Sequence, residues 1–394
     1  MRRLATAASI TAFLFFVANE ARADFSVVPL PEILTDPNEG NTYGLLPVIL
    51  LLDRDQKLEH IIAHDVRWNR ITGVFGAFRL FGYPTIDQRY FLTLRKSQKI
   101  DEDYIGEYEH IGLWDGALAV LANVTYWRDS RLRFYGFGND TDDDSETNYT
   151  QRRMAALLRV GYRPTPNWEI AWQGRAEDLS IRPGGVDDLP FTGEVFPDTT
   201  GLEGSTVHSE GLIVSYDDRD SQRITTRGLL GQARVEVVDR ALGSSTSFVK
   251  WGFEVRKFHP WRERFVLAMR GALDYLSGVN QTPFYERHDL GGVKTLRGFG
   301  NGRFVDAHRF VGTLELRTLA YARRLFDVLT EIEVAPFLDA GRVFSKMTAF
   351  PLEALHYVGG IGFRGIVRPQ VVGFVDVGFG SDGPAVFTGL DYPF

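Results

Sequence analysis

The feature that most constrains this chain is a two-residue alternation of apolar and polar side chains in its second half. The segment FVKWGFEVRKF is the clearest case, because Val249, Trp251, Phe253 and Val255 alternate with Lys250, Gly252, Glu254 and Arg256. Residues 265–275 and 370–380 show the same pattern. Successive side chains of a β-strand point to opposite faces, so each segment has one apolar face and one face of charges and glycines. That pattern is typical of a strand with lipid on one side and a wet lumen on the other.

A soluble β-sandwich or propeller would show a similar alternation, with the apolar face in the core and the charged face in solvent. The end of the chain favours the membrane interpretation. In AVFTGLDYPF, an apolar series of one parity ends in Tyr392 and Phe394. Such a series is poorly suited to the exposed edge of a soluble sheet. It suits a last strand that closes a barrel and places Tyr392 and Phe394 at the aromatic girdle.

The first 23 residues have the pattern of a secretory signal peptide. Arg2 and Arg3 precede a short apolar run over residues 10–18, and Ala21-Arg22-Ala23 is a cleavage signal of small residues. We expect cleavage after Ala23, which leaves 394 − 23 = 371 residues. The removed piece carries a net charge of +2, so the mature chain has −7 − 2 = −9, which argues against a nucleic-acid partner.

The composition then limits how an exported chain of this kind can enter a membrane. It has no cysteine, so no disulfide stabilises it. No mature segment approaches the ~20 apolar residues of a transmembrane helix. A chain that enters a membrane without such helices must form a closed β-barrel, because every backbone polar group has to pair internally. We therefore expect an all-β chain: a signal peptide over 1–23, an irregular periplasmic lead-in over 24–40, and an outer-membrane antiparallel β-barrel over 41–394.

Three motifs in the second half carry a family resemblance. They are Leu296-Arg297-Gly298-Phe299 in a glycine-rich segment, Glu315 in GTLELR, and Phe337-Leu338-Asp339-Ala340-Gly341. The segment DDRDSQRITTRG (217–228) resembles a further motif, and Phe394 matches a terminal aromatic residue. In this order the motifs resemble those of the BamA/TamA-type outer-membrane assembly-factor family, also called the bacterial surface antigen family. The resemblance covers residues 213–394 and is loose before them.

The resemblance implies a barrel of about 16 strands, with the Leu-Arg-Gly-Phe loop folded back into the lumen. Arg297 would then meet Glu315 and Asp339. The alternation itself also predicts that Glu315 and Asp339 face inward, where two carboxylates on neighbouring strands need a cation. An arginine suits this role because its planar fork bonds two acceptors at once. Gly298 would allow a tight turn, Phe299 would pack on the inner wall, and Gly341 completes the Asp339 strand motif.

Two further expectations concern client handling and the barrel seam. Family members typically carry periplasmic POTRA domains, whereas 371 residues over about 16 strands leave no room for one before Tyr43. A separate periplasmic partner is the expected substitute. We expect the first strand over residues 42–52, with Pro47, and the last strand to contain Pro393. Proline donates no ladder hydrogen bond, so this seam could open sideways, unless Pro47 precedes the strand proper.

Other patterns carry little weight. His60 and His64 lie four residues apart as in a zinc motif, but Ile61 stands where that motif has glutamate. The acidic run 140–146 lacks the spacing of an EF-hand, so a solvated loop is the better interpretation. The chain has neither a G-x-S-x-G elbow nor a P-loop. We therefore expect no cofactor, no metal and no enzyme activity, since an outer-membrane hydrolase would need a nucleophile and base close together.

The sequence thus predicts an integral protein of the bacterial outer membrane that contacts its lipids. The first functional hypothesis is insertion or translocation of proteins, or of other envelope components, with outer-membrane proteins as clients. The alternative is a non-catalytic pore or surface receptor that keeps the barrel without client handling.

Overall fold

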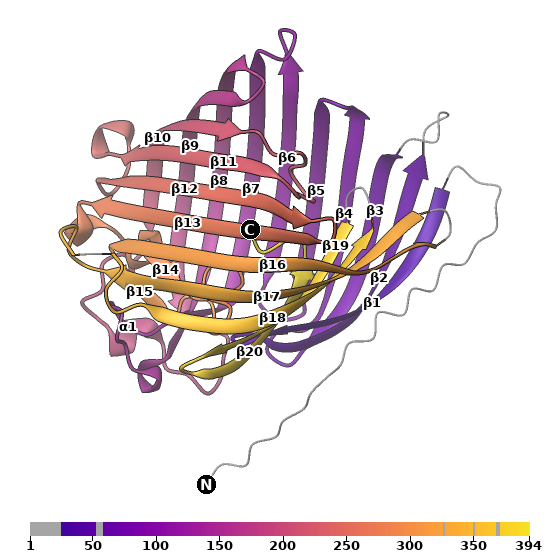
Figure 1. Ribbon diagram of the computed structural model, residues 1–394. Helices are drawn as coiled ribbons and strands as arrows, with labels where there is room; N and C mark the ends of the chain where they lie inside the picture. The colour runs from indigo at the N-terminus through magenta and orange to yellow at the C-terminus, as the bar shows by residue number, and fades with distance from the viewer. Residues whose placement is uncertain (1–24, 53–57, 326–327, 350, 368–370) are drawn as a thin grey trace.

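The computed structural model describes residues 25–52, 58–325, 328–349, 351–367 and 371–394. Eighteen strands form one sheet that curls round into a nearly closed barrel, and β14 and β15 form a separate two-stranded sheet (Figure 1). No helix in the described residues is long and apolar enough to cross a membrane. The expected signal peptide, residues 1–23, lies outside these residues.

The strands of the barrel follow one another along the wall in chain order, and each pairs antiparallel with the next. Their bounds are β1 Phe25–Asp36, β2 Gly40–Leu52, β3 Leu58–Asn69, β4 Gly73–Thr85, β5 Gln88–Ser97, β6 Glu102–Leu113, β7 Leu118–Phe134, β8 Thr147–Thr165, β9 Trp168–Pro183, β10 Ser205–Asp217, β11 Gly228–Val238, β12 Phe248–Arg262, β13 Phe265–Ser277, β16 His308–Leu325, β17 Val328–Phe344, β18 His356–Val367, β19 Val371–Gly380 and β20 Gly383–Leu390.

The remaining elements lie in the connections. They are β14 His288–Leu290, β15 Phe304–Asp306, the short helix α1 Thr192–Val195, and single 3-10 turns at Asp143–Ser145, Arg240–Leu242, Val279–Gln281 and Phe284–Glu286. Because antiparallel neighbours turn at alternate ends, the connection 278–307 lies at one end of the barrel. The connection 218–227 and the end of β20 lie at the other end.

The side chains of the strands alternate between the two faces of the wall. In β12, Trp251, Phe253 and Val255 are exposed on the outer face, whereas Gly252 is buried. In β16, Leu314 is exposed and Glu315 is fully buried. An all-β antiparallel barrel with an apolar exterior is therefore confirmed, and the soluble sandwich or propeller is not the fold.

The expected number of 16 strands was wrong, because the barrel sheet has 18. One reason is that several hairpins turn over only two residues, such as 166–167 and 263–264, so they use little chain. A second reason is that residues 25–36 form β1. The expectation of an irregular lead-in over 24–40 was wrong for that segment, because β1 pairs with β2 along its whole length in spite of Pro29 and Pro31.

The seam is consequently not where the sequence placed it. Pro47 lies in β2, which pairs with β1 on one side and β3 on the other. The seam lies between β1 and β20, where no backbone ladder joins the two strands over their described lengths. A side chain bridges them instead: the Thr35 amide donates to Thr388 Oγ1 at 3.0 Å, and this hydroxyl lies 3.5 Å from the Ile33 carbonyl oxygen.

The expected place of the last residues was also wrong. β20 ends at Leu390, so Pro393 lies outside the last strand. Tyr392 and Phe394 are not in an outward girdle, because the chain turns inward after β20 and Phe394 packs on Phe258 and Ala268 of the inner wall. The C-terminus lies inside the ring of strands (Figure 1).

Candidate functional site

The connection between β13 and β16, residues 278–307, folds back into the barrel and forms the candidate site. It turns at Gly291 and Gly292, whose φ angles of 122° and 87° favour glycine. Thr295 closes the turn, because its hydroxyl accepts from the Gly291 amide at 2.9 Å and lies 2.6 Å from the Gly291 carbonyl oxygen. This geometry carries Arg297 into the lumen, where its side chain is 1% exposed.

Arg297 binds carboxylates from two neighbouring strands of the wall. Its Nε and Nη2 donate to the two oxygens of Asp339 on β17, at 2.9 Å each, in a bidentate pair. Its Nη1 donates to Glu315 Oε2 on β16 at 2.7 Å. The guanidinium also lies 3.5 Å from the centroid of the Phe337 ring. A planar guanidinium can make all these contacts at once, which an ammonium cannot.

The charges around Arg297 form a larger set than the sequence analysis identified. Arg297 Nη1 also donates to Asp376 on β19 at 3.1 Å. Arg364 of β18 pairs with Asp376 and lies 3.3 Å from Glu315, and Arg317 Nε donates to Glu315 at 2.9 Å. We call these six residues the lumen network. It holds three guanidiniums and three carboxylates, so its formal charges cancel, as buried charges require.

Glycines let the loop backbone approach the wall closely. A Cβ at Gly378 would lie 2.1 Å from the carbonyl oxygen of Arg297, and one at Gly298 would lie 2.7 Å from the Gly380 amide nitrogen. At Gly341 an added Cβ would meet the Phe310 carbonyl oxygen at 2.9 Å and Leu290 at 3.0 Å. A side chain at any of these positions would push the loop away from the wall.

The aromatic end of the motif lies in an apolar cluster between loop and wall. Phe299 is 2% exposed, and its ring lies 5.2 Å from that of Phe304 in an edge-to-face arrangement. The cluster joins loop residues to residues of β13, β16, β17 and β18: Ala272, Leu290, Leu296, Phe299, Phe304, Val311, Phe337, Val343 and Val358. Burial of this surface supports the docked position of the loop independently of the ion pairs.

A second ion-pair anchor, of opposite charge, holds the part of the loop that precedes Gly291. Glu286 is buried, accepts from Arg175 of β9 at 3.1 and 3.3 Å, and pairs with Lys250 of β12. Burial opposes ionisation of this carboxyl, but the Lys250 and Arg175 cations lower the pKa of Glu286 below its usual range. The loop thus pairs its Glu286 carboxylate with cations on one part of the wall and its Arg297 guanidinium with carboxylates on another part.

The loop tip also bridges the seam at this end of the barrel. The side-chain Nδ2 of Asn38 donates to the Asn301 backbone carbonyl oxygen at 2.7 Å, and Nδ2 of Asn301 donates to Asp36 Oδ2 at the end of β1 at 3.2 Å. Arg303 donates to Asp382, in the turn before β20, at 2.6 Å. Residues 301–303 therefore clasp both sides of the seam.

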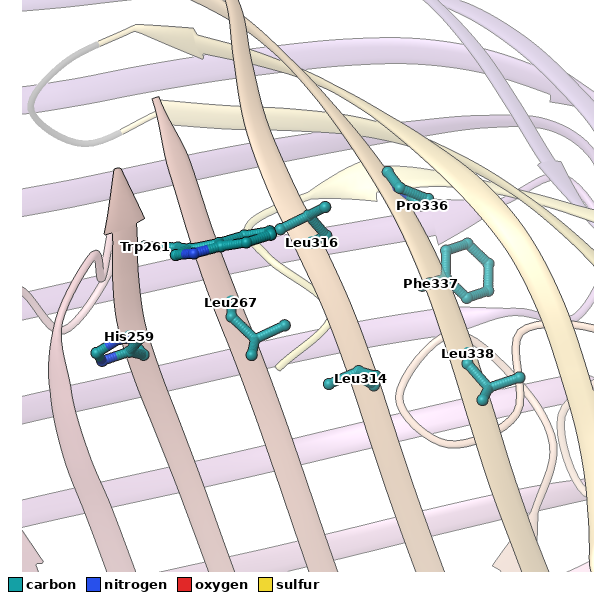
Figure 2. A pocket seen from close by; sticks show the side chains of 8 residues that line it. All are labelled: His259, Trp261, Leu267, Leu314, Leu316, Pro336, Phe337 and Leu338. Atoms are coloured by element: carbon teal, nitrogen blue, oxygen red, sulfur yellow. The ribbon is translucent and has the colours of Figure 1, made fainter. Parts of the chain in front are cut away.

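The outer face of the wall behind Arg297 contains an apolar groove of about 640 Å³. The ladder between β16 and β17 is interrupted there, since the pairs on either side are Glu315 with Phe337 and Thr318 with Val334. Pro336 lies in this gap and has no N–H to donate. Figure 2 shows the lining side chains on adjacent strands: His259, Trp261, Leu267, Leu314, Leu316, Pro336, Phe337 and Leu338.

Comparisons with known proteins place this chain in a family. The model of the Omp85 superfamily domain matches residues 117–359. The chain belongs to the Omp85 superfamily. The resemblance to BamA/TamA-type barrels is therefore confirmed, and as an Omp85 protein the chain is a barrel of the bacterial outer membrane, within a superfamily of insertion and transport proteins.

Two solved structures are similar in fold. BamA from Haemophilus ducreyi lacking POTRA domains 1–3 has a TM-score of 0.57 and 13% identity, over 92% of this chain and 75% of that chain. CdiB from Escherichia coli has a TM-score of 0.53 and 10% identity, over 97% of this chain and 68% of that chain. A search of curated proteins found no significant match.

Sequence reasoning missed Asp376, Arg364, Arg317 and Glu286 as partners in this site. Asp376 alternates with Val375 and Val377, so its inward orientation was visible in the sequence. The sequence did not show which residue Asp376 would contact. A period of two predicts the face on which a residue lies, but not which residues of other strands lie at the same height in the barrel. The two histidines of the zinc-like pattern instead contact aromatic residues: His60 with the Tyr90 hydroxyl at 2.9 Å, and His64 with the Phe78 ring.

Proposed function

We propose that this Omp85 barrel inserts or translocates proteins, or other envelope components, at the outer membrane. The observation that carries the proposal is the seam. In the part of the chain that the structure describes, every other pair of neighbouring strands in the barrel sheet is joined by a backbone ladder, whereas β1 and β20 are linked by the Thr388 hydroxyl. Unpaired backbone groups on facing edges can accept a strand from another chain, or separate and expose the lumen to lipid.

The docked loop supports this function over a permanently open pore. Arg297 and Glu286 anchor the loop to different parts of the wall, and its aromatic residues fill the space between. The same loop clasps the seam through Asn301 and Arg303. We infer that loop position and seam opening are linked. Arg297, Gly298 and Phe299 of the loop would then form a latch with Glu315, Asp339 and Gly341 of the wall.

The direct test is a quantitative outer-membrane proteome after depletion of this protein. Insertase or translocase function predicts loss of a defined set of barrels or surface proteins, and restoration by the wild-type chain. A matched chain with Thr35→Cys and Thr388→Cys should restore that set only when its disulfide is reduced, because oxidation locks the seam. The chain has no native cysteine to interfere.

Two outcomes would count against the proposal. An unchanged proteome after depletion would favour a non-catalytic pore or surface receptor. Full restoration by the oxidised, locked seam would show that clients do not use it. The 218–227 connection lies at the end of the barrel where β1 begins, which we expect to face the periplasm. Chemical cross-linking from this connection would in addition test for a separate periplasmic partner that delivers clients.

A further inference from the structure

A row of charged side chains lies on the outer face of the wall, across four strands that are neighbours in the sheet (Figure 1). It consists of Lys96 of β5, Glu102 of β6, Arg128 of β7 and Arg152 of β8, and each is the cross-strand partner of the next. We call these four residues the charged row. The Lys96 and Arg152 side chains are 67% and 49% exposed, and Met154, on the same face of β8, is exposed as well.

The charges of this row do not cancel. Lys96 binds Glu102 at 2.9 Å, and Arg152 lies 3.6 Å from Asp178 of β9. Arg128 has no acidic partner in the described residues, and it stands directly opposite Arg152 in the ladder between β7 and β8. Like charges directly opposite each other destabilise a strand pair. Three cations against two carboxylates, in a chain whose net charge is −7, therefore leave a place for an anion between Arg128 and Arg152.

The row lies near the end of the barrel that carries the longer connections. Lys96 and Glu102 flank the turn 98–101, which is at the same end as the connections 135–146, 184–204 and 278–307. The two-residue turns 86–87, 166–167 and 263–264 lie at the opposite end. Outer-membrane barrels have short periplasmic turns and longer extracellular loops, so the row belongs to the outer-leaflet side of the wall.

An aromatic pair lies next to the row on its membrane side. Tyr104 and Tyr126 are the following cross-strand pair on the same face of β6 and β7, and their rings stack with centroids 5.7 Å apart. Aromatic girdles of this kind mark the boundary between hydrocarbon and headgroups. Cations just beyond the girdle lie at the level of the headgroups, where long basic side chains are well tolerated on the lipid face.

An apolar groove of about 360 Å³ begins beside Lys96. The groove exists because the partner of Lys96 in β4 is Gly76, which has no side chain to fill it. A Cβ added at Gly76 would have no atom closer than 3.7 Å. The groove is lined on the outer face by His64, Val66, Phe78, Leu94, Lys96 and Tyr104. An apolar groove that ends at a cation has the shape and the charge to take an acyl chain with an anionic headgroup.

We propose that this part of the outer face is a binding site for a phosphate-bearing lipid of the outer leaflet. Its phosphate contacts Arg128, Arg152 and Lys96, and one acyl chain lies in the groove beside Gly76. Guanidinium groups bind phosphate oxygens through charge-assisted hydrogen bonds, and the phosphate supplies the anion that the row lacks. The site involves neither the loop 278–307 nor the seam, so the inference holds whether or not the barrel handles protein clients.

The test is native mass spectrometry of the full chain in detergent, with dioleoyl phosphatidylglycerol and dioleoyl phosphatidylcholine added at equal concentration. Wild type should retain phosphatidylglycerol in preference to phosphatidylcholine. Arg128→Gln should weaken phosphatidylglycerol binding roughly tenfold, because it removes hydrogen bonds to a charged group, and should leave phosphatidylcholine unchanged. The matched control is Arg262→Gln, which makes the same change of charge at an exposed position at the other end of the barrel and should bind like wild type.

Two further measurements distinguish a lipid from a free anion and check the fold. Gly76→Leu should weaken lipid binding by filling the groove, and excess inorganic phosphate should not displace phosphatidylglycerol from wild type. The unfolding midpoints of the variants should stay near that of wild type, because the changed side chains face outward. Arg152→Gln replaces Arg128→Gln if the latter does not fold.

Three outcomes would overturn the proposal. The first is equal retention of phosphatidylglycerol by wild type and by the folded row variant. The second is an equal loss with Arg262→Gln, which would mean that the lipid responds only to overall charge. The third is displacement of the lipid by inorganic phosphate together with wild-type binding by Gly76→Leu, which would indicate a site for the free anion.

Discussion

At the scale of single residues, the site depends on one guanidinium that serves three carboxylates. Arg297→Ala would leave Glu315, Asp339 and Asp376 with two cations among them, and breaking such a buried pair costs roughly 3–5 kcal/mol. Arg297→Lys should cost only part of this stability, because an ammonium still pairs with the carboxylates but cannot make the bidentate pair with Asp339. Thermal unfolding in detergent micelles should rank wild type above Lys above Ala. Equal unfolding midpoints for the Lys and Ala variants would show that the planar geometry of the guanidinium is unimportant. The control is Arg262→Ala at an exposed position, which should unfold at the wild-type midpoint.

The second anchor predicts a dependence on pH. The folded-state pKa of Glu286 lies below its unfolded value of about 4.3, so its contribution to stability is complete above about pH 5 and is lost as the pH falls toward the folded value. Unfolding midpoints measured from pH 7 to pH 3 should therefore fall more for wild type than for Glu286→Gln, which should already be lower at pH 7. The exposed Glu263→Gln should follow wild type. If the unfolding midpoints of wild type and Glu286→Gln fell in parallel with pH, the ion pairs of Glu286 would not stabilise the fold as predicted.

At the scale of elements, two prolines interrupt ladders inside the wall. Pro336 lies in the gap between β16 and β17, and Pro47 lies in a gap between β2 and β3, where pairing is recorded at Leu45 and again at Val48. Pro336→Val and Pro47→Val should each supply a missing donor and raise the unfolding midpoint by a few degrees, about the effect of 1 kcal/mol. Neither should change the yield of the Thr35–Thr388 seam disulfide. If Pro47→Val changed the yield of this disulfide, Pro47 would affect the seam after all.

The elements also show how far the sequence could be used. Alternation identified β12, β13 and β19 and the inward side of Glu315 and Asp339, because the faces of a strand follow directly from its period of two. It could not identify β1, since prolines and a weak pattern resemble an irregular segment until β2 is present as a partner. It also placed Tyr392 and Phe394 on the outer face, because the parity of a strand continues in the sequence after the strand has ended at Leu390.

At the scale of the whole molecule, the proposed latch implies that the docked loop 278–307 closes the lumen. Wild type in planar bilayers should show low steady conductance, because the loop is held by Arg297 on one side and Glu286 on another. Arg297→Ala or Glu286→Gln alone should give a partial rise, since the remaining anchor and the buried Phe299 still hold part of the loop. The double variant should conduct more than the sum of the two single increases. High conductance in wild type, unchanged in the double variant, would mean that the loop does not close the lumen, and would favour the pore or receptor over the insertase or translocase.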